Sequence, residues 1–153
     1  MLFSSPAEFA QTLPAQSRLL GLDVGKKTIG LALSDVLRGI ASPLLTIERT
    51  KFSKDIKQLK NIIEKHAVGG LVVGYPVNMD GSFGPRAQST RSFATNCSKH
   101  IDLPMLLWDE RLSTLAVERA MLEADLSRQR REQLVDKLAA SYMLQGFLDY
   151  LKP

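Results

Sequence analysis

The stretch LLGLDVGKKTIGLALSD at residues 19–35 consists of two apolar segments joined by a short polar connection. Residue size and polarity alternate along both segments, which predicts a β-hairpin. A connection of either two or four residues around Lys26 and Lys27 places Asp23 opposite Gly30. Side chains alternate between the faces of a sheet, so one face of this hairpin is continuously hydrophobic and the other carries small residues beside Asp23. We expect a hollow there, with space for a ligand, because glycine inside a strand often marks the close approach of another group.

The order of the other segments predicts a mixed five-stranded sheet with helices on both faces. GLVVG at 70–74 is short and apolar throughout, as are strands at the centre of parallel sheets. Three strands, a helix, a strand, a helix, a strand and terminal helices form the order of a ribonuclease-H-like domain, an α/β fold. The strands are expected at 18–25, 28–35, 43–48, 70–74 and 103–108, and the helices at about 54–66, from Pro85, at about 114–123 and from Ser127 to about 151.

The length of 153 residues fits one domain, for which we expect residues 18–151, after a flexible N-terminal segment at 1–17. The longest stretch without a charged or strongly polar residue, 67–77, is too short to cross a bilayer, and the N-terminus has no basic region typical of a secretory signal. The single cysteine excludes an internal disulfide and a cysteine-based metal site. We therefore expect a cytoplasmic protein that does not bind membranes.

The formal net charge of +4 favours a polyanionic partner, because clustered lysines and arginines displace the counterions of phosphates. Lys26 and Lys27 lie at the expected hairpin tip, and Arg86 lies at the start of the helix after the loop NMDGSFG. The N-terminus of this helix would attract a phosphate through its free amide groups. Arg111 is a fourth candidate phosphate contact, and it is equally suited to pair with Asp109.

Carboxylates at three places are expected to converge at one end of the sheet. Asp23 is the first, and Asp109 and Glu110 come at the carboxyl end of a parallel strand, where α/β sheets bind ligands. Consecutive strand residues point to opposite faces, and we favour Glu110 on the Asp23 face because its side chain is longer. Asp136 lies at the edge of the apolar stripe of the last helix, and small residues one turn later let this side approach the sheet.

Three converging carboxylates would repel one another by about 4 kcal/mol per close pair at an effective dielectric constant near 20. A divalent cation removes this repulsion, and ligands that are all oxygen select Mg²⁺ or Mn²⁺ over zinc. We therefore expect Asp23, Glu110 and Asp136 to be metal ligands and catalytic residues, with Asp109 as an alternative ligand. Such sites catalyse phosphodiester cleavage, commonly with two metal ions. A purely structural role for Asp23, in a turn or paired with Lys27, is the competing interpretation.

Four stretches resemble the YqgF (RuvX-like) family, which is described as pre-16S rRNA nucleases and Holliday-junction-resolvase-like proteins. They are LGLDVGKKTIGLALSD, VVGYPVNMDGSFGPRA, WDERLS and VDKLAASYMLQGFL, in the order and spacing of the family over nearly all of residues 18–150. The resemblance implies a ribonuclease-H-like fold and acidic active-site roles for Asp23, the acid of WDER and Asp136. Thr28 is a departure, because the family commonly has arginine there, so Lys26 is a candidate for a displaced positive charge.

The leading hypothesis is a metal-dependent nuclease that processes the 5′ end of pre-16S rRNA, and the alternative is a Holliday-junction-resolvase-like DNA endonuclease. The expected partners are pre-16S rRNA or branched DNA, together with ribosomal precursor particles, and the protein is expected to be a monomer or homodimer. An actin-like or sugar-kinase ATPase would share the D-x-G hairpin, but those enzymes bind nucleotide between two such domains. A non-catalytic nucleic-acid-binding module is the third hypothesis.

Overall fold

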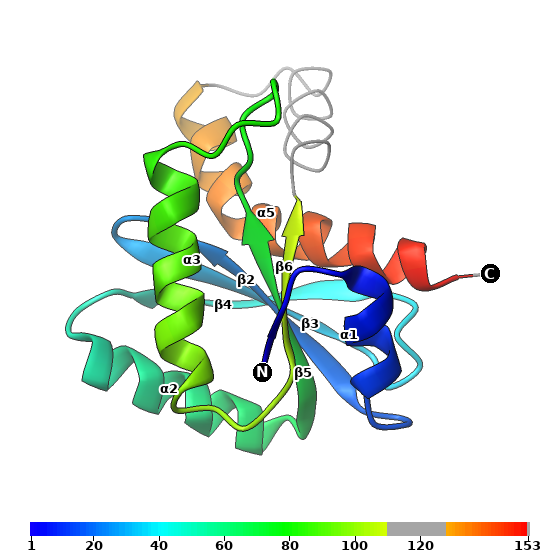
Figure 1. Cartoon of the computed structure of the whole chain (residues 1–153). Helices are drawn as coiled ribbons and strands as arrows, with labels where there is room; N and C mark the ends of the chain where they lie inside the picture. Colours follow the sequence, from blue (N-terminus) through cyan, green and yellow to red (C-terminus); the bar gives the residue numbers. More distant parts are fainter. Residues whose placement is uncertain (110–127, 153) are drawn as a thin grey trace.

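The computed structural model describes residues 1–109 and 128–152, and the side chains of residues 128–137 lie outside this description. A mixed sheet runs through the centre, with helices on both faces (Figure 1). The elements are β1 (Leu2–Phe3), α1 (Pro6–Thr12), β2 (Arg18–Val24), β3 (Thr28–Ser34), β4 (Ala41–Glu48), α2 (Phe52–Lys65), β5 (Val68–Tyr75), α3 (Pro85–Ser98), β6 (Met105–Asp109) and α5 (Arg128–Leu151).

The described sheet has six strands in the order β1-β6-β5-β2-β3-β4. β3 is antiparallel to both of its neighbours, β2 and β4, whereas the pairs β2–β5, β5–β6 and β6–β1 are parallel. For the described elements the expected order of strands and helices is confirmed, but the expected number of five strands is wrong. The extra strand, β1, pairs Leu2 with Met105 and Phe3 with Leu106. Two residues are too few to show an alternating pattern, so this strand could not be recognised from sequence.

The N-terminal segment 1–17, which was expected to be flexible, contains β1 and α1 in the structure. Ser5 caps α1 by accepting a hydrogen bond from the backbone N–H of Glu8. Phe9 is fully buried and packs edge to face against Phe147 of α5. The segment therefore differs from the expectation because one aromatic side chain anchors it to the sheet domain.

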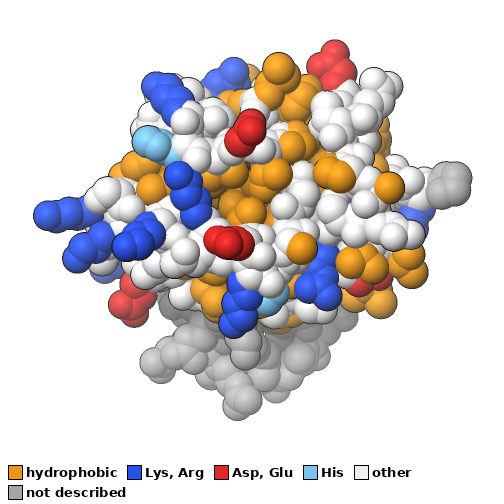
Figure 2. Space-filling view, turned by 90° about the horizontal axis from the view of Figure 1, so that it is seen from below, with side chains coloured by type: hydrophobic (Ala, Val, Ile, Leu, Met, Phe, Trp, Pro, Cys, Tyr) orange, Lys and Arg blue, Asp and Glu red, His pale blue; other side chains and the backbone are white. Residues whose placement is uncertain are grey.

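Two hydrophobic cores lie on opposite faces of the sheet. α2 and α3 cover one face, where the hydrophobic face of the β2–β3 hairpin packs, and α1 and α5 cover the other. Seen from below, Lys and Arg side chains gather on the left, the side on which Figure 1 shows α2 (Figure 2). The hairpin thus presents its apolar side to α2 and α3 and its glycine-containing side to α5.

The glycine-containing side is not empty along its whole length. A Cβ atom at Gly21 would lie 2.9 Å from the Cβ of Leu144 and 3.4 Å from the carbonyl oxygen of Ala140, both in α5. The small residue at this position lets the helix approach the strand, so the expected hollow is filled by α5 at Gly21.

Candidate active site

The register of the β2–β3 hairpin places Asp23 at a particular point of the sheet. Asp23 pairs with Gly30 and Gly21 pairs with Ala32, as expected from the sequence. The backbone N–H of Gly25 donates to the carbonyl oxygen of Thr28 at 2.8 Å, which closes the hairpin. Lys26 and Lys27 form its exposed tip.

The Asp23 carboxylate lies on the α5 side of the sheet and is bordered by glycine on both neighbouring strands. Gly30 is its partner in β3, and Gly74 follows Val73, the last β5 residue that pairs with β2. Because neither glycine has a side chain, backbone alone lies next to Asp23 on these strands. The Asp23 side chain is 18% exposed, so it is largely shielded but still open to a ligand.

Arg86 is the predicted phosphate contact that the structure brings to Asp23. Its Nη2 atom lies 3.8 Å from Oδ1 of Asp23, and its side chain is 60% exposed. Arg86 stands in the first turn of α3, whose N-cap residue Gly84 supplies no side-chain cap. An exposed cation and uncapped helix amides therefore border the carboxylate, an arrangement that suits a bound phosphate.

A tight turn fixes the start of α3. The backbone N–H of Asn78 donates to the carbonyl oxygen of Ser82 at 2.9 Å, and Oδ1 of Asp80 accepts hydrogen bonds from the N–H and hydroxyl of Ser82 at 2.9 and 2.6 Å. Gly81 has a φ of 87°, which favours glycine. Asn78 and Asp80 thus shape the turn and hold the loop that carries α3 to Asp23.

Asp109 lies at the end of β6, paired with Tyr75. Leu106 belongs to the core on the α5 side and Leu107 to the core on the α2–α3 side. Alternation along the strand therefore assigns Asp109 to the α2–α3 face, opposite to Asp23. The next two residues, Glu110 and Arg111, lie outside the described part of the chain.

The course of α5 relates Asp136 to Asp23. Gln145 of α5 hydrogen-bonds to the loop and strand that follow β3, accepting from the N–H of Ala41 and donating to the carbonyl of Gly39. That region lies beside the start of β2, whereas Ala140, earlier in the helix, lies over Gly21. Going backwards along α5 therefore leads towards the Asp23 end of β2, and Asp136 comes one turn before Ala140 (Figure 1). The side chain of Asp136 is outside the described set.

Arg49 is a residue of the site that the sequence analysis missed. Its Nη1 atom donates to the carbonyl oxygen of Gly25 at 2.6 Å, and its backbone N–H donates to the carbonyl oxygen of Lys27 at 2.8 Å. Its guanidinium lies 5.1 Å from the ring centre of Phe93 in α3. Arg49 thereby ties the hairpin tip to α3, which carries Arg86. In the sequence, the only sign of this role is that a basic residue directly follows an expected strand.

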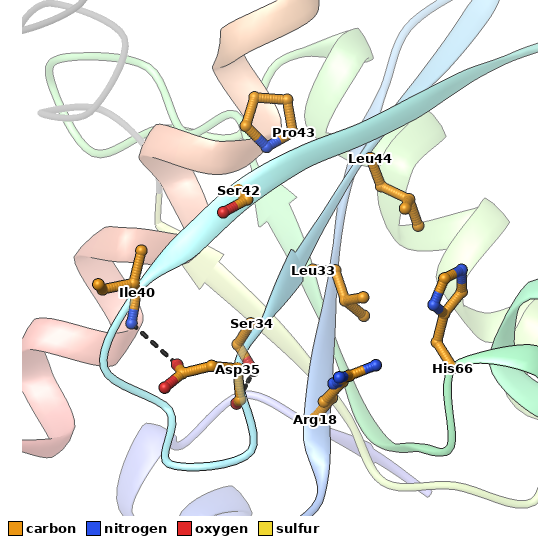
Figure 3. A pocket seen from close by; sticks show the side chains of 9 residues that line it. All are labelled: Arg18, Leu33, Ser34, Asp35, Ile40, Ser42, Pro43, Leu44 and His66. Atoms are coloured by element: carbon orange, nitrogen blue, oxygen red, sulfur yellow. Dashed lines mark hydrogen bonds between the residues drawn. The ribbon is translucent and has the colours of Figure 1, made fainter.

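A pocket of about 490 Å³ lies at the other end of β2 and is separate from the carboxylate site. Arg18 and His66 line it together with Leu33 and Leu44 (Figure 3). Asp35, also in the lining, accepts hydrogen bonds from the N–H groups of Ile40 and Gly39, which lower the pKa of its carboxyl group. The Asp35 carboxylate thus stabilises the turn that follows β3. Among the described side chains, those of residues 1–109 and 138–152, no three of His, Cys, Asp or Glu are grouped so that they could hold a metal ion.

Comparisons with known proteins agree with the resemblance seen in the sequence. The profile of the family described as "RuvX: Holliday junction resolvase" matches residues 17–150. A Rhodobacter capsulatus protein named "Putative pre-16S rRNA nuclease" is 60% identical over 144 residues, which are 94% of this chain and 91% of that protein. A Paramagnetospirillum magneticum protein of the same name is 59% identical over 145 residues, or 95% and 94% of the two chains.

Solved structures support the fold. RuvC of Thermus thermophilus in complex with a Holliday junction substrate has a TM-score of 0.52 at 12% identity, covering 88% of this chain and 96% of that one. The yeast mitochondrial Holliday junction resolvase Ydc2 has a TM-score of 0.50 at 14% identity, covering 93% and 82%. The expected ribonuclease-H-like α/β fold is therefore confirmed. No helix within the described ranges is long and apolar enough to span a membrane.

Proposed function

The chain belongs to the RuvX family and is a nuclease, and we propose that it processes the 5′ end of pre-16S rRNA by hydrolysing phosphodiester bonds. The choice of RNA is supported by relatives that are 60% and 59% identical over nearly the whole chain, a likeness that extends over the site as well as the fold. The proposal places the protein in the cytoplasm, acting on ribosomal precursor particles.

The observation that carries the proposal is the setting of Asp23. A shielded carboxylate with glycine on both neighbouring strands lies 3.8 Å from an exposed arginine. It stands at the carboxyl ends of parallel strands, where α/β sheets bind ligands.

We assign metal binding to Asp23, Glu110 and Asp136, with Asp109 as the alternative to Glu110. Asp23 fits a hard cation such as Mg²⁺ or Mn²⁺, because it offers carboxylate oxygens and its side chain is partly exposed. The alternation of β6 supports Glu110, since Asp109 falls on the opposite face, and the course of α5 supports Asp136. The bound metal would supply activation of water and stabilisation of the leaving oxygen.

The remaining site residues are assigned to the phosphate backbone. When substrate enters, the Arg86 guanidinium would leave its ion pair with Asp23 and bind a phosphate oxygen, because the Arg86 side chain is mostly exposed. Lys26 and Lys27 at the hairpin tip, and Arg111 after β6, would contact neighbouring phosphates. These contacts orient the scissile bond and carry no sequence information.

Cleavage of precursor 16S rRNA by the purified protein tests this proposal. The wild type is expected to cleave it with Mg²⁺ or Mn²⁺, and Asp23→Asn to be at least about 100-fold slower, because the variant loses a charge that is worth several kcal/mol beside a metal. Circular dichroism and thermal unfolding would show that the variant is folded. Undiminished cleavage by Asp23→Asn would refute the assignment.

A four-way DNA junction is the second candidate substrate, favoured by the description of the matching family. Both substrates should be compared in the same assay, with the same enzyme preparation. Faster cleavage of the junction than of the RNA would replace the RNA proposal by a resolvase-like activity. The assignment of Asp23 would stand in either case.

A further inference from the structure

A row of exposed lysines follows α2. They recur every three residues, from the N-cap of the helix onward, and we call them the lysine track: Lys51, Lys54, Lys57 and Lys60. Two carboxylates in α2 could neutralise these lysines. Asp55 is 2% exposed and accepts hydrogen bonds from Thr50, and Glu64 is exposed near the other end of the helix. No lysine of the track forms a salt bridge within the part of the chain that the structure describes.

This charge arrangement opposes the stability of α2. Lysines three residues apart are neighbours on a helix surface and repel one another. Lys51 and Lys54 stand at the helix N-terminus, where the positive end of the helix dipole disfavours a cation, and no side chain caps this end. A bound polyanion would relieve both effects. The track is therefore suited to bind a row of phosphates.

The lysine track is continuous with the hairpin of the candidate active site. The backbone N–H of Arg49 bonds to Lys27 and its guanidinium bonds to Gly25, both in the tip. Lys51 follows two residues later and begins the track. Each step of three residues advances about 4.5 Å along the helix, so the track extends about 14 Å from the hairpin side. Figure 2 shows Lys and Arg side chains gathered on this side of the molecule.

We propose that the lysine track binds the phosphate backbone of the substrate beyond the scissile bond, where a nucleic-acid duplex continues from the hairpin over α2. The proposal rests on the proposed nuclease function and names a surface outside the catalytic carboxylates. Such contacts would add affinity that depends on salt and would not read the base sequence. They would also favour structured substrates that extend far enough to reach α2.

The salt dependence of RNA binding tests the track. The variant Lys54→Gln/Lys57→Gln is compared with the control Arg91→Gln/Lys152→Gln, which loses the same charge at exposed positions outside α2. Two probes are used, a long RNA duplex that reaches past α2 and a short one that ends before it. Dissociation constants are measured for each protein over a series of salt concentrations.

The track variant is expected to reduce the slope of log affinity against log salt by about 2 for the long duplex, because each phosphate contact contributes about 0.9. Its slope for the short duplex, and both slopes of the control, should match the wild type. If the slope of the track variant for the long duplex equals that of the wild type, or if the control loses as much slope, the lysine track does not bind the substrate. These lysines would then only be solvated.

Binding is measured without reference to cleavage, so the two proposals fail differently. A wild type that binds the duplex but cleaves no nucleic acid would refute the nuclease function and still permit the track to be tested. If the wild type cleaves RNA, and the track variant binds RNA with the same affinity as the wild type, only the role of the lysine track is refuted. A wild type that binds neither duplex would overturn both.

Discussion

Gly21 and Asp23 lie two residues apart on the same face of β2, and their surroundings differ sharply. At Gly21, α5 approaches so closely that a Cβ atom would lie 2.9 Å from Leu144. At Asp23, the neighbouring strand position is Gly30, the side chain remains 18% exposed, and the nearby Arg86 extends into solvent. One face of one strand thus changes, within two residues, from a packing surface to the proposed binding surface.

The difference teaches how the same small residue types serve two purposes. Beneath α5, glycine permits close packing of a helix on the sheet, and this contributes to stability. Beside Asp23, glycine leaves the partner position in β3 without a side chain, and we propose that a ligand binds there. A glycine-rich strand face is therefore a signal of close approach, and the fold decides whether a helix or a ligand makes that approach.

Substitution of Gly21 is expected to have the largest effect on stability. Gly21→Ala places a Cβ atom against Leu144 and should lower the free energy of unfolding by about 1–3 kcal/mol through overpacking. Urea denaturation followed by circular dichroism measures this. Gly39→Ala is the matched control, because nothing lies within 4 Å of a Cβ there, and it should change stability little. Equal effects of both substitutions would contradict the close packing of α5.

Loss of Arg49 should come next. Arg49→Met removes a charged hydrogen bond to Gly25 and a cation–π contact with Phe93, and should cost about 1–2 kcal/mol of unfolding free energy. Because the hairpin tip loses its tie to α3, cleavage should also slow. Arg91→Met, at an exposed position of α3, is the control. If Arg49→Met is as stable and as active as the control, Arg49 does not hold the hairpin tip in place.

Metal binding is expected to give a smaller stabilisation. Mg²⁺ at ten times its dissociation constant should stabilise the wild type by about 1.4 kcal/mol and raise its melting temperature, because the ligand binds only the folded state. Asp136→Asn should lose this shift, whereas an exposed control such as Glu64→Gln should keep it. A shift of the same size in Asp136→Asn would contradict its assignment as a ligand.

Asp35 offers the smallest effect and a contrast to Asp23. Its pKa is lowered by hydrogen bonds from the N–H groups of Ile40 and Gly39, so its ionised form stabilises the fold at pH values above the unfolded pKa, near 4. This contribution is lost as the pH falls through the lower folded pKa. Urea denaturation between about pH 6 and about pH 3 should therefore show a stability difference between wild type and Asp35→Asn that shrinks with falling pH. A stability difference that does not change with pH would contradict a contribution from the ionised Asp35 carboxylate.

The hairpin and the order of elements could be predicted because they depend on local patterns. Alternation fixed the pairing of Asp23 with Gly30, and the continuous apolar run at 70–74 indicated the centre of β5. The last helix is likewise expected from its apolar stripe, and the structure describes it as α5 from Arg128 onward. The expected helix at 114–123 lies outside the described residues. In each confirmed case, sequence neighbours alone determine the structure.

Features that depend on distant parts of the chain were missed. β1 and α1 are held by Phe9 packing on Phe147, a contact between residues far apart in the sequence. The role of Gly21 depends on where α5 crosses the sheet, and Arg49 acts through a hairpin tip more than twenty residues earlier. No local period encodes such contacts, so sequence patterns could identify the carboxylates but not what lies over them.

We propose that the nuclease site lies on the α5 face of the sheet, at Asp23, and not on the opposite face. Cleavage rates of precursor 16S rRNA by Asp23→Asn and by Asp109→Asn test it most directly, with unfolding measured for both. Asp23→Asn should lose at least about 100-fold in rate while remaining folded, because a charge beside the metal is removed. Asp109→Asn should keep most of its activity. Normal cleavage by Asp23→Asn together with loss in Asp109→Asn would contradict the account.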